Sequence, residues 1–169
     1  MSRPVAKWIA TCGIEEVGPG TIGSMFAIPL CYALLHLSLP RNAVVICYAA
    51  AIVVVFVLGL MTIRRAQTQL GPRIDGHRRV KDRDQGQIVI DEVLGMLISY
   101  APFLFLTPTS EWLAYGLAFG LFRLFDITKP PPVRFFDRMK SPAGVMLDDA
   151  VAGLWAVFVL VVLRSFELW

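Results

Sequence analysis

The sequence contains few charged residues for its length. Only 17% of its 169 residues are Asp, Glu, Lys or Arg, 56% are hydrophobic, and the mean hydropathy is +0.63. Soluble domains average about 25% charged residues, which they need to cover their surface. The composition therefore excludes an ordinary soluble protein and favours a membrane protein, whose length fits a single domain over residues 1–169.

Cysteine and histidine are also scarce. The three cysteines, Cys12, Cys31 and Cys47, have no CxxC spacing, which excludes a disulfide framework and a zinc site. None of them has an arginine six residues later, so the thiolate type of phosphatase is excluded too. The two histidines, His36 and His77, are isolated and do not suit a histidine nucleophile. The small net charge of +3 gives no reason to expect a nucleic-acid partner, and no feature calls for an obligate protein partner.

Long apolar runs are what the sequence does contain. A helix needs about 20 apolar residues to cross the hydrocarbon core of a bilayer. Residues 43–63 meet this requirement most clearly, because they carry no charge and are followed by Arg64 and Arg65. The predicted spans are residues 22–39, 43–63, 88–106, 112–128 and 144–163. They predict an all-α, multi-pass membrane helical bundle of about five helices, with an interfacial segment after the fourth.

Lysine and arginine gather in residues 64–87 and 129–140, and near the N-terminus. Short loops rich in these residues stay on the cytoplasmic side of a membrane. The pattern predicts a multi-pass protein of the cell inner membrane, with the N-terminus in the cytoplasm and the C-terminus outside.

Acidic residues stand at one end of each of the last three predicted spans. They are Asp91 and Glu92 at the start of the third, Asp126 at the end of the fourth, and Asp148 and Asp149 at the start of the fifth. Because neighbouring helices alternate in direction, all five are expected at the same cytoplasmic depth. A carboxylate inside a membrane costs about 3 kcal/mol even on gentle scales, so it persists when it is paired or holds a cation. Carboxylates gathered at one depth predict Mg²⁺, with structural ion pairs to Arg123, Lys129 and nearby loop bases as the alternative.

Basic and hydroxyl side chains suited to binding a phosphate accompany these acids. The candidates are Arg123, Lys129, Arg134, Arg138 and Thr21. Arg123 shares a helix face with Asp126, while Thr21 stands in a glycine-rich turn at a helix start, where an anion can bind. The residues after Lys129 include three prolines and two phenylalanines, which is typical of a segment lying in the membrane interface. Plain membrane anchoring by Arg134 and an ordinary helix start at Thr21 stay open as alternatives.

Four strings of the sequence resemble the motifs of the phosphatidylglycerophosphatase A family in their order and spacing. They are GPGTIGS at 18–24, IVIDEVLGM at 88–96, FRLFDITKPPPVRFFDR at 122–138 and GVMLDDAVAG at 144–153. The most specific is the pattern R-x-x-D-x-x-K-P-x-P-x-x-x-x-D. The resemblance implies an inner-membrane enzyme that removes the phosphate monoester of phosphatidylglycerophosphate to give phosphatidylglycerol. It also implies Mg²⁺ as cofactor and an active site facing the cytoplasm.

The resemblance carries over to individual residues by position. The resemblance implies that the acidic motif residues are metal ligands: Asp91, Glu92, Asp126, Asp137, Asp148 and Asp149. All of them except Asp137 are also catalytic candidates. The basic motif residues are Arg123, Lys129 and Arg138. Asp84 matches an aspartate that commonly precedes the acidic pair. The chain departs from the family pattern at Glu15 and Glu16, where small residues and proline are more usual, and in its long basic loop.

The predicted partners of such an enzyme are its phospholipid substrate and the bilayer. Two other functions are alternatives to this interpretation. A CDP-alcohol phosphatidyltransferase also uses aspartates at membrane depth, but residues 75–78 only begin its D-G-x-x-A-R pattern. A small cation transporter would place acids at the midplane or at several depths. The single depth predicted for the acids disfavours this alternative.

Overall fold

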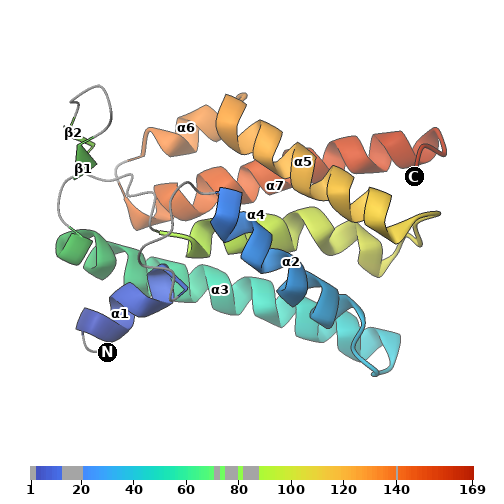
Figure 1. Ribbon diagram of the computed structural model, residues 1–169, viewed down its shortest axis with the longest axis horizontal. Coiled ribbons are helices and arrows are strands. Elements are labelled where there is room, and N and C mark those ends of the chain that lie inside the picture. The colour runs from blue at the N-terminus through green and yellow to red at the C-terminus, as the bar shows by residue number, and fades with distance from the viewer. Residues whose placement is uncertain (1–2, 13–20, 71–72, 75–79, 82–87, 140) are drawn as a thin grey trace.

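Helices make up nearly all the regular structure of the computed structural model, which describes residues 3–12, 21–70, 73–74, 80–81, 88–139 and 141–169 (Figure 1). In chain order they are α1 (Arg3–Ala10), α2 (Thr21–Leu35), α3 (Arg41–Leu70), α4 (Ile90–Tyr100), the 3₁₀ helix η1 (Ala101–Leu104), α5 (Glu111–Thr128), α6 (Val133–Asp137) and α7 (Pro142–Ser165). A small antiparallel hairpin of β1 (Arg73–Ile74) and β2 (Val80–Lys81) follows α3. The prediction of an all-α protein is confirmed.

Each predicted span coincides with a helix, but the third is divided. The predicted helix over residues 88–106 becomes α4, of 11 residues, followed by η1. Pro102 lacks the N–H that would continue the α-helical hydrogen bonds, and Ala101 instead bonds to Ile98, three residues back. At 1.5 Å per residue α4 is about 16 Å long, which is much shorter than a hydrocarbon core.

Two helices of the described residues are long and apolar enough to cross a membrane. They are α3 over Arg41–Arg65, with a mean hydropathy of 2.9, and α7, with 2.1. Only 17% of the most apolar window of α3 is buried, and Ile46 and Val53 on its outer face are 67% and 60% exposed. A soluble protein would bury such a helix in its core, so this apolar surface suits contact with lipid. Membrane crossing by the other predicted spans stays a prediction.

The centre of the bundle is α4, which is buried on most of its sides and packs against α7, α2, α3 and α5. Two glycines bring α4 and α7 together: a Cβ added to Gly153 would lie 2.6 Å from the carbonyl oxygen of Gly95. Only hydrogen at both positions permits this approach. Asp91 lies one helical turn before Gly95 on α4, and Asp149 lies one turn before Gly153 on α7. The close crossing of the two helices therefore places the turns that carry these aspartates beside each other.

The far half of the bundle is held by hydrogen bonds from buried aromatic side chains. The Tyr48 hydroxyl donates to the carbonyl oxygen of Leu97 at 2.8 Å, and the Tyr100 hydroxyl donates to that of Tyr115 at 2.9 Å. These bonds link α3 to α4 and α4 to α5. The N-terminal helix and the C-terminus lie at opposite ends of the long axis (Figure 1), and α4 and α7 both begin at the end where α1 lies.

Candidate active site at one end of the bundle

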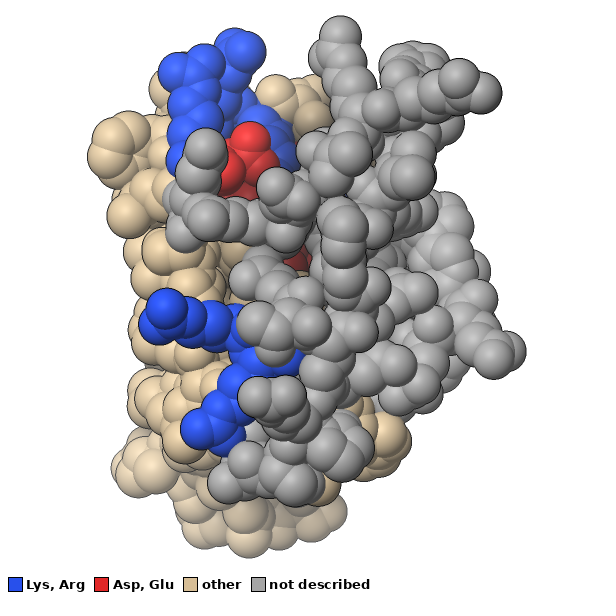
Figure 2. All heavy atoms as spheres, turned by 90° about the vertical axis from the view of Figure 1, so that its left-hand side faces the viewer, with Lys and Arg blue, Asp and Glu red and all other residues tan. Residues whose placement is uncertain are grey.

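Charged side chains from several helices meet at the end of the bundle where α4 and α7 begin. Asp91 and Glu92 come from the first turn of α4, Arg123 and Asp126 from the end of α5, Asp137 from α6, and Asp148 and Asp149 from the second turn of α7. Figure 2 faces this end and shows Lys and Arg side chains standing out around acidic side chains that lie deeper. The structure thus brings the acids of three predicted spans to one depth.

Arg123 is the centre of the first group of contacts. Its Nη1 lies 2.7 Å from Oδ2 of Asp126, one turn along α5, and 3.3 Å from Oε1 of Glu92 on α4. The same nitrogen donates to the hydroxyl of Ser24 on α2 at 3.2 Å, and that hydroxyl donates to Oε2 of Glu92 at 3.0 Å. The guanidinium therefore ties together α2, α4 and α5.

Ser24 is the member of this group that sequence reasoning passed over as a site residue. It lies in the same glycine-rich string as Thr21, but three residues later, and its side chain is fully buried. The sequence did contain a signal for this role, because Ser24 is a polar residue three positions into an apolar helix. A hydroxyl buried there needs a hydrogen-bond partner. The side chain of Thr21 lies outside what the structure describes.

Lys129 is the centre of the second group. It ends α5 with a left-handed backbone at φ 46°, a conformation that costs a non-glycine residue about 1 kcal/mol. This turn directs its ammonium group to Oδ1 of Asp137 at 2.5 Å and to Oδ2 of Asp148 at 2.8 Å. Partial burial lowers the pKa of Lys129, but the hydrogen bonds to the two carboxylates outweigh that effect, so the net result is a raised pKa. The side chain thus stays charged throughout the neutral range.

Asp91 and Asp149 carry the negative charge that these two bases leave unmatched. Asp149 is 5% exposed and lies within electrostatic range of four other carboxylates, those of Asp91, Glu92, Asp126 and Asp148. Within the described part of the chain no basic side chain pairs with Asp91 or Asp149, and the carboxylate of Asp91 accepts the N–H of Glu92 at 2.9 Å. Buried carboxylates without a basic partner are stabilised either by a bound cation or by taking up a proton.

The donor set is chemically suited to a hard divalent cation. All the unmatched ligands are carboxylate oxygens, and Mg²⁺ is commonly held by one or two carboxylates together with waters and a substrate phosphate. Over the residues that the structure describes, no three or more His, Cys, Asp or Glu side chains are placed closely enough to hold a metal ion by themselves. The neighbouring carboxylates of Asp91 and Asp149 fit a site of the kind that water and phosphate complete.

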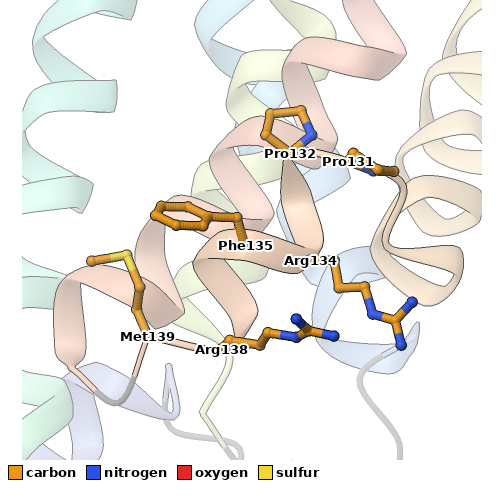
Figure 3. Close-up of a pocket in the computed structure, with 6 residues that line it drawn as sticks. All are labelled: Pro131, Pro132, Arg134, Phe135, Arg138 and Met139. Carbon is orange, nitrogen blue, oxygen red and sulfur yellow. The ribbon is translucent and has the colours of Figure 1, made fainter.

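Arg134 and Arg138 take part in neither group of contacts. Arg134 on α6 and Arg138, which directly follows this helix, are exposed, form no ion pair with any described residue, and line an open pocket with neighbouring prolines (Figure 3). Their predicted contact with the substrate phosphate stays a prediction. Asp84, Glu15, Glu16 and residues 75–78 lie outside the described residues.

Comparison with known proteins assigns the family. The family model described as Phosphatidylglycerophosphatase A matches residues 5–164, nearly the whole chain. The chain belongs to the phosphatidylglycerophosphatase A family. The predicted family and the predicted class of enzyme, a phosphatase, are therefore confirmed.

Three relatives of the chain are similar over most of their length. Phosphatidylglycerophosphatase A of Escherichia coli strain K12 is 32% identical over 88% of this chain and 75% of its own length. Phosphatidylglycerophosphatase A of Haemophilus influenzae is 31% identical over 92% and 85%. A Bacteroides thetaiotaomicron protein named "Putative phosphatidylinositol-3-phosphatase" is 32% identical over 90% and 87%. No solved structure matches the chain.

Proposed function

We propose that the protein hydrolyses the terminal phosphate monoester of phosphatidylglycerophosphate, with Mg²⁺, at the cytoplasmic face of the inner membrane. The observation that carries the proposal is the pair of unmatched carboxylates, Asp91 and Asp149, beside two bases, Arg123 and Lys129, at one end of a bundle with an apolar outer surface. Both a metal ion and basic side chains stabilise the charge of a bound dianionic phosphate. Two relatives are named for this activity.

The residues that would hold Mg²⁺ are the acids around the crossing of α4 and α7. Asp91 and Asp149 are the leading ligands, whereas Glu92, Asp126, Asp137 and Asp148 are paired with Arg123 or Lys129, and their part as ligands stays a prediction. When bound, the ion would neutralise phosphate charge and favour deprotonation of the attacking water. All other parts of the chemistry belong to this chain's own side chains.

Arg123 and Lys129 would bind the non-bridging oxygens of the phosphate. Each is already held by two carboxylates: Glu92 and Asp126 orient the guanidinium, while Asp137 and Asp148 orient the ammonium group. In the reaction water attacks phosphorus, a site carboxylate accepts the proton, and the bond from phosphorus to the glycerol oxygen breaks, that oxygen taking up a proton. Attack by an aspartate instead would leave phosphate on the protein, which acid quenching with labelled substrate would detect.

The position of the site on the bundle supports the cytoplasmic face. The apolar outer surface of α3 ends at Arg64 and Arg65, which are exposed at the same end of the bundle as the acids. Basic residues at the end of a span stay on the cytoplasmic side. The substrate's headgroup would meet the site at that depth.

The test is phosphate release from phosphatidylglycerophosphate in detergent micelles, with Mg²⁺ and with excess EDTA. Wild type should release phosphate only with Mg²⁺, and Asp149→Asn should lower the rate at least 100-fold. Glu111→Gln is the matched control, because it removes a carboxylate that is exposed and pairs with His36 rather than with any site residue. Absence of release by folded wild-type protein would refute the proposal.

A second substrate is favoured by one specific relative. The Bacteroides thetaiotaomicron protein carries the name of a phosphatase for phosphatidylinositol 3-phosphate and is as similar as the others. Both lipids join a phosphate monoester and a phosphate diester through a polyol. Rates measured side by side on the two lipids would rank them. The transporter and transferase alternatives have no comparable support, since none of the three relatives is named for either function.

A further inference from the structure

The surface of α6 holds an open pocket that the reaction described above does not use. Its volume is about 440 Å³, and it is lined by Pro131, Pro132, Arg134, Phe135, Arg138 and Met139. In Figure 3 the side chains of Arg134 and Arg138 extend in one direction from α6, and those of Phe135 and Met139 extend in another. The surface of the pocket is therefore mostly apolar, and the two arginine side chains extend from one edge of it.

The positively charged guanidinium groups of the two arginines at this pocket can bind an anionic ligand. Asp137 stands between them in the sequence, but its Oδ1 is taken by Lys129 at 2.5 Å, and neither arginine forms an ion pair with a described residue. Each guanidinium presents a planar fork that binds two phosphate oxygens. Two such forks at a membrane interface would select an anionic phosphate group.

The apolar side of the pocket indicates that this phosphate belongs to a lipid. Phe135 is 66% exposed and Met139 is 38% exposed, while Val133 on the opposite face of α6 is buried against the bundle. A short helix that buries one side and exposes an aromatic and arginines on the other is suited to the boundary between headgroups and acyl chains. A free phosphate would make no use of these apolar side chains.

The pocket is also next to the proposed site. Asp137, which neighbours Arg138 and lies one turn from Arg134, holds Lys129, and Lys129 reaches Asp148. In phosphatidylglycerophosphate a single glycerol joins the terminal monoester to the diester, so the two phosphates must bind within about one or two helical turns of each other. Asp137 bonds to Lys129 and is the chain neighbour of Arg138, so the α6 pocket and the Lys129 group adjoin each other at this residue.

We propose that Arg134 and Arg138 in the α6 pocket bind the diester phosphate of the phospholipid substrate, while the terminal monoester binds at Lys129 and Arg123. This inference rests on the proposed function and adds to it a basis for specificity. A lipid with both a monoester and a diester engages two sites, whereas phosphatidic acid, with its monoester directly on diacylglycerol, engages one. Arg134 and Arg138 are specificity-determining residues that touch no reacting atom.

Binding to the full chain in detergent, with two probes, tests the assignment independently of activity. Short-chain phosphatidylglycerol carries only the diester, and glycerol 3-phosphate carries only the monoester. The double variant Arg134→Gln/Arg138→Gln should weaken phosphatidylglycerol binding about tenfold and leave glycerol 3-phosphate binding unchanged. Lys129→Met should do the reverse. Loss of both probes in the arginine variant, or of neither, would overturn the proposal.

Kinetics supply the second arm. In mixed micelles the arginine variant should raise KM for phosphatidylglycerophosphate about tenfold, keep kcat within twofold, and leave kcat/KM for phosphatidic acid unchanged. The control Arg64→Gln/Arg65→Gln removes two positive charges from the same end of the bundle and should leave the kinetic constants for both lipids unchanged. An equal effect of both double variants would identify general attraction to anionic lipid and overturn the assignment. If wild type releases no phosphate from phosphatidylglycerophosphate, the proposed function fails, and the binding arm still decides the pocket.

Discussion

The ammonium group of Lys129 lies 2.8 Å from the carboxylate of Asp148, which joins the residue that ends α5 to the acidic pair of α7. The same nitrogen contacts Asp137 on α6, so a single side chain links three segments of the proposed site. A left-handed backbone at Lys129 makes this reach possible. Backbone conformations of this kind persist where the surrounding structure holds them in place, and the two ion pairs do so here.

Replacement of Lys129 by methionine is therefore expected to lower kcat/KM at least 100-fold, which corresponds to about 2.7 kcal/mol of transition-state stabilisation. It removes a positive charge at the phosphate and leaves Asp137 and Asp148 without their common partner. Lys129→Arg should keep part of the activity, since it keeps the charge but changes the geometry. Steady-state rates on phosphatidylglycerophosphate measure both. Full activity of Lys129→Met would contradict the assigned role.

The glycine crossing of α4 and α7 gives a prediction about stability. Gly153→Ala should lower the unfolding free energy by about 1–3 kcal/mol, because the new Cβ would lie 2.6 Å from the backbone oxygen of Gly95. Gly116→Ala and Gly120→Ala on α5 are matched controls, since a Cβ at either position meets no atom within 4 Å. Alanine favours a helix over glycine by about 1 kcal/mol, so the controls should be neutral or stabilising. Thermal unfolding in detergent distinguishes them.

Ser24 connects α2 to the site through one hydroxyl. Ser24→Ala removes its hydrogen bonds with Arg123 and Glu92, and hydrogen bonds to charged groups are worth about 1.5–3 kcal/mol. We expect kcat/KM to fall about tenfold. Ser99→Ala is the control, because this equally buried hydroxyl bonds to Gly95 within α4 and, among the described residues, to no other helix. Equal losses in the two variants would mean that the Ser24 contact serves packing alone.

Mg²⁺ should stabilise the protein against unfolding, apart from any effect on activity. A ligand at 100 times its Kd adds about 2.7 kcal/mol to stability, so the Tm of wild type should rise with Mg²⁺. In EDTA the variant Asp149→Asn should be more stable than wild type, since it removes one of the unmatched buried charges. It should then gain little from Mg²⁺. Glu111→Gln should respond to Mg²⁺ as wild type does, and an identical response of Asp149→Asn would exclude this residue as a ligand.

Much of the fold could be predicted because apolar runs and their flanking charges report helix positions directly. The ranges 43–63 and 144–163 lie within α3 and α7, the two helices that can cross a membrane by length and composition. The apolar pattern did not predict that residues 88–106 form two helices, although Pro102 lies within them. A continuous apolar run does not distinguish an α-helix from an α-helix that continues as a 3₁₀ helix.

The sequence by itself determined the depth of the charged residues, because position along a helix follows from residue number at a constant rise. It thereby indicated which acids and bases share one end of the bundle. Only the tertiary structure decided which of them face one another, because the rotation and spacing of packed helices depend on contacts such as Gly95 with Gly153. The structure likewise distinguishes Lys129, which holds Asp148, from Arg134 and Arg138, which are exposed at the α6 pocket. The sequence alone gives no reason to assign these three basic residues different roles. In the proposal, Lys129 binds the monoester phosphate of the lipid headgroup, and Arg134 and Arg138 bind the diester phosphate.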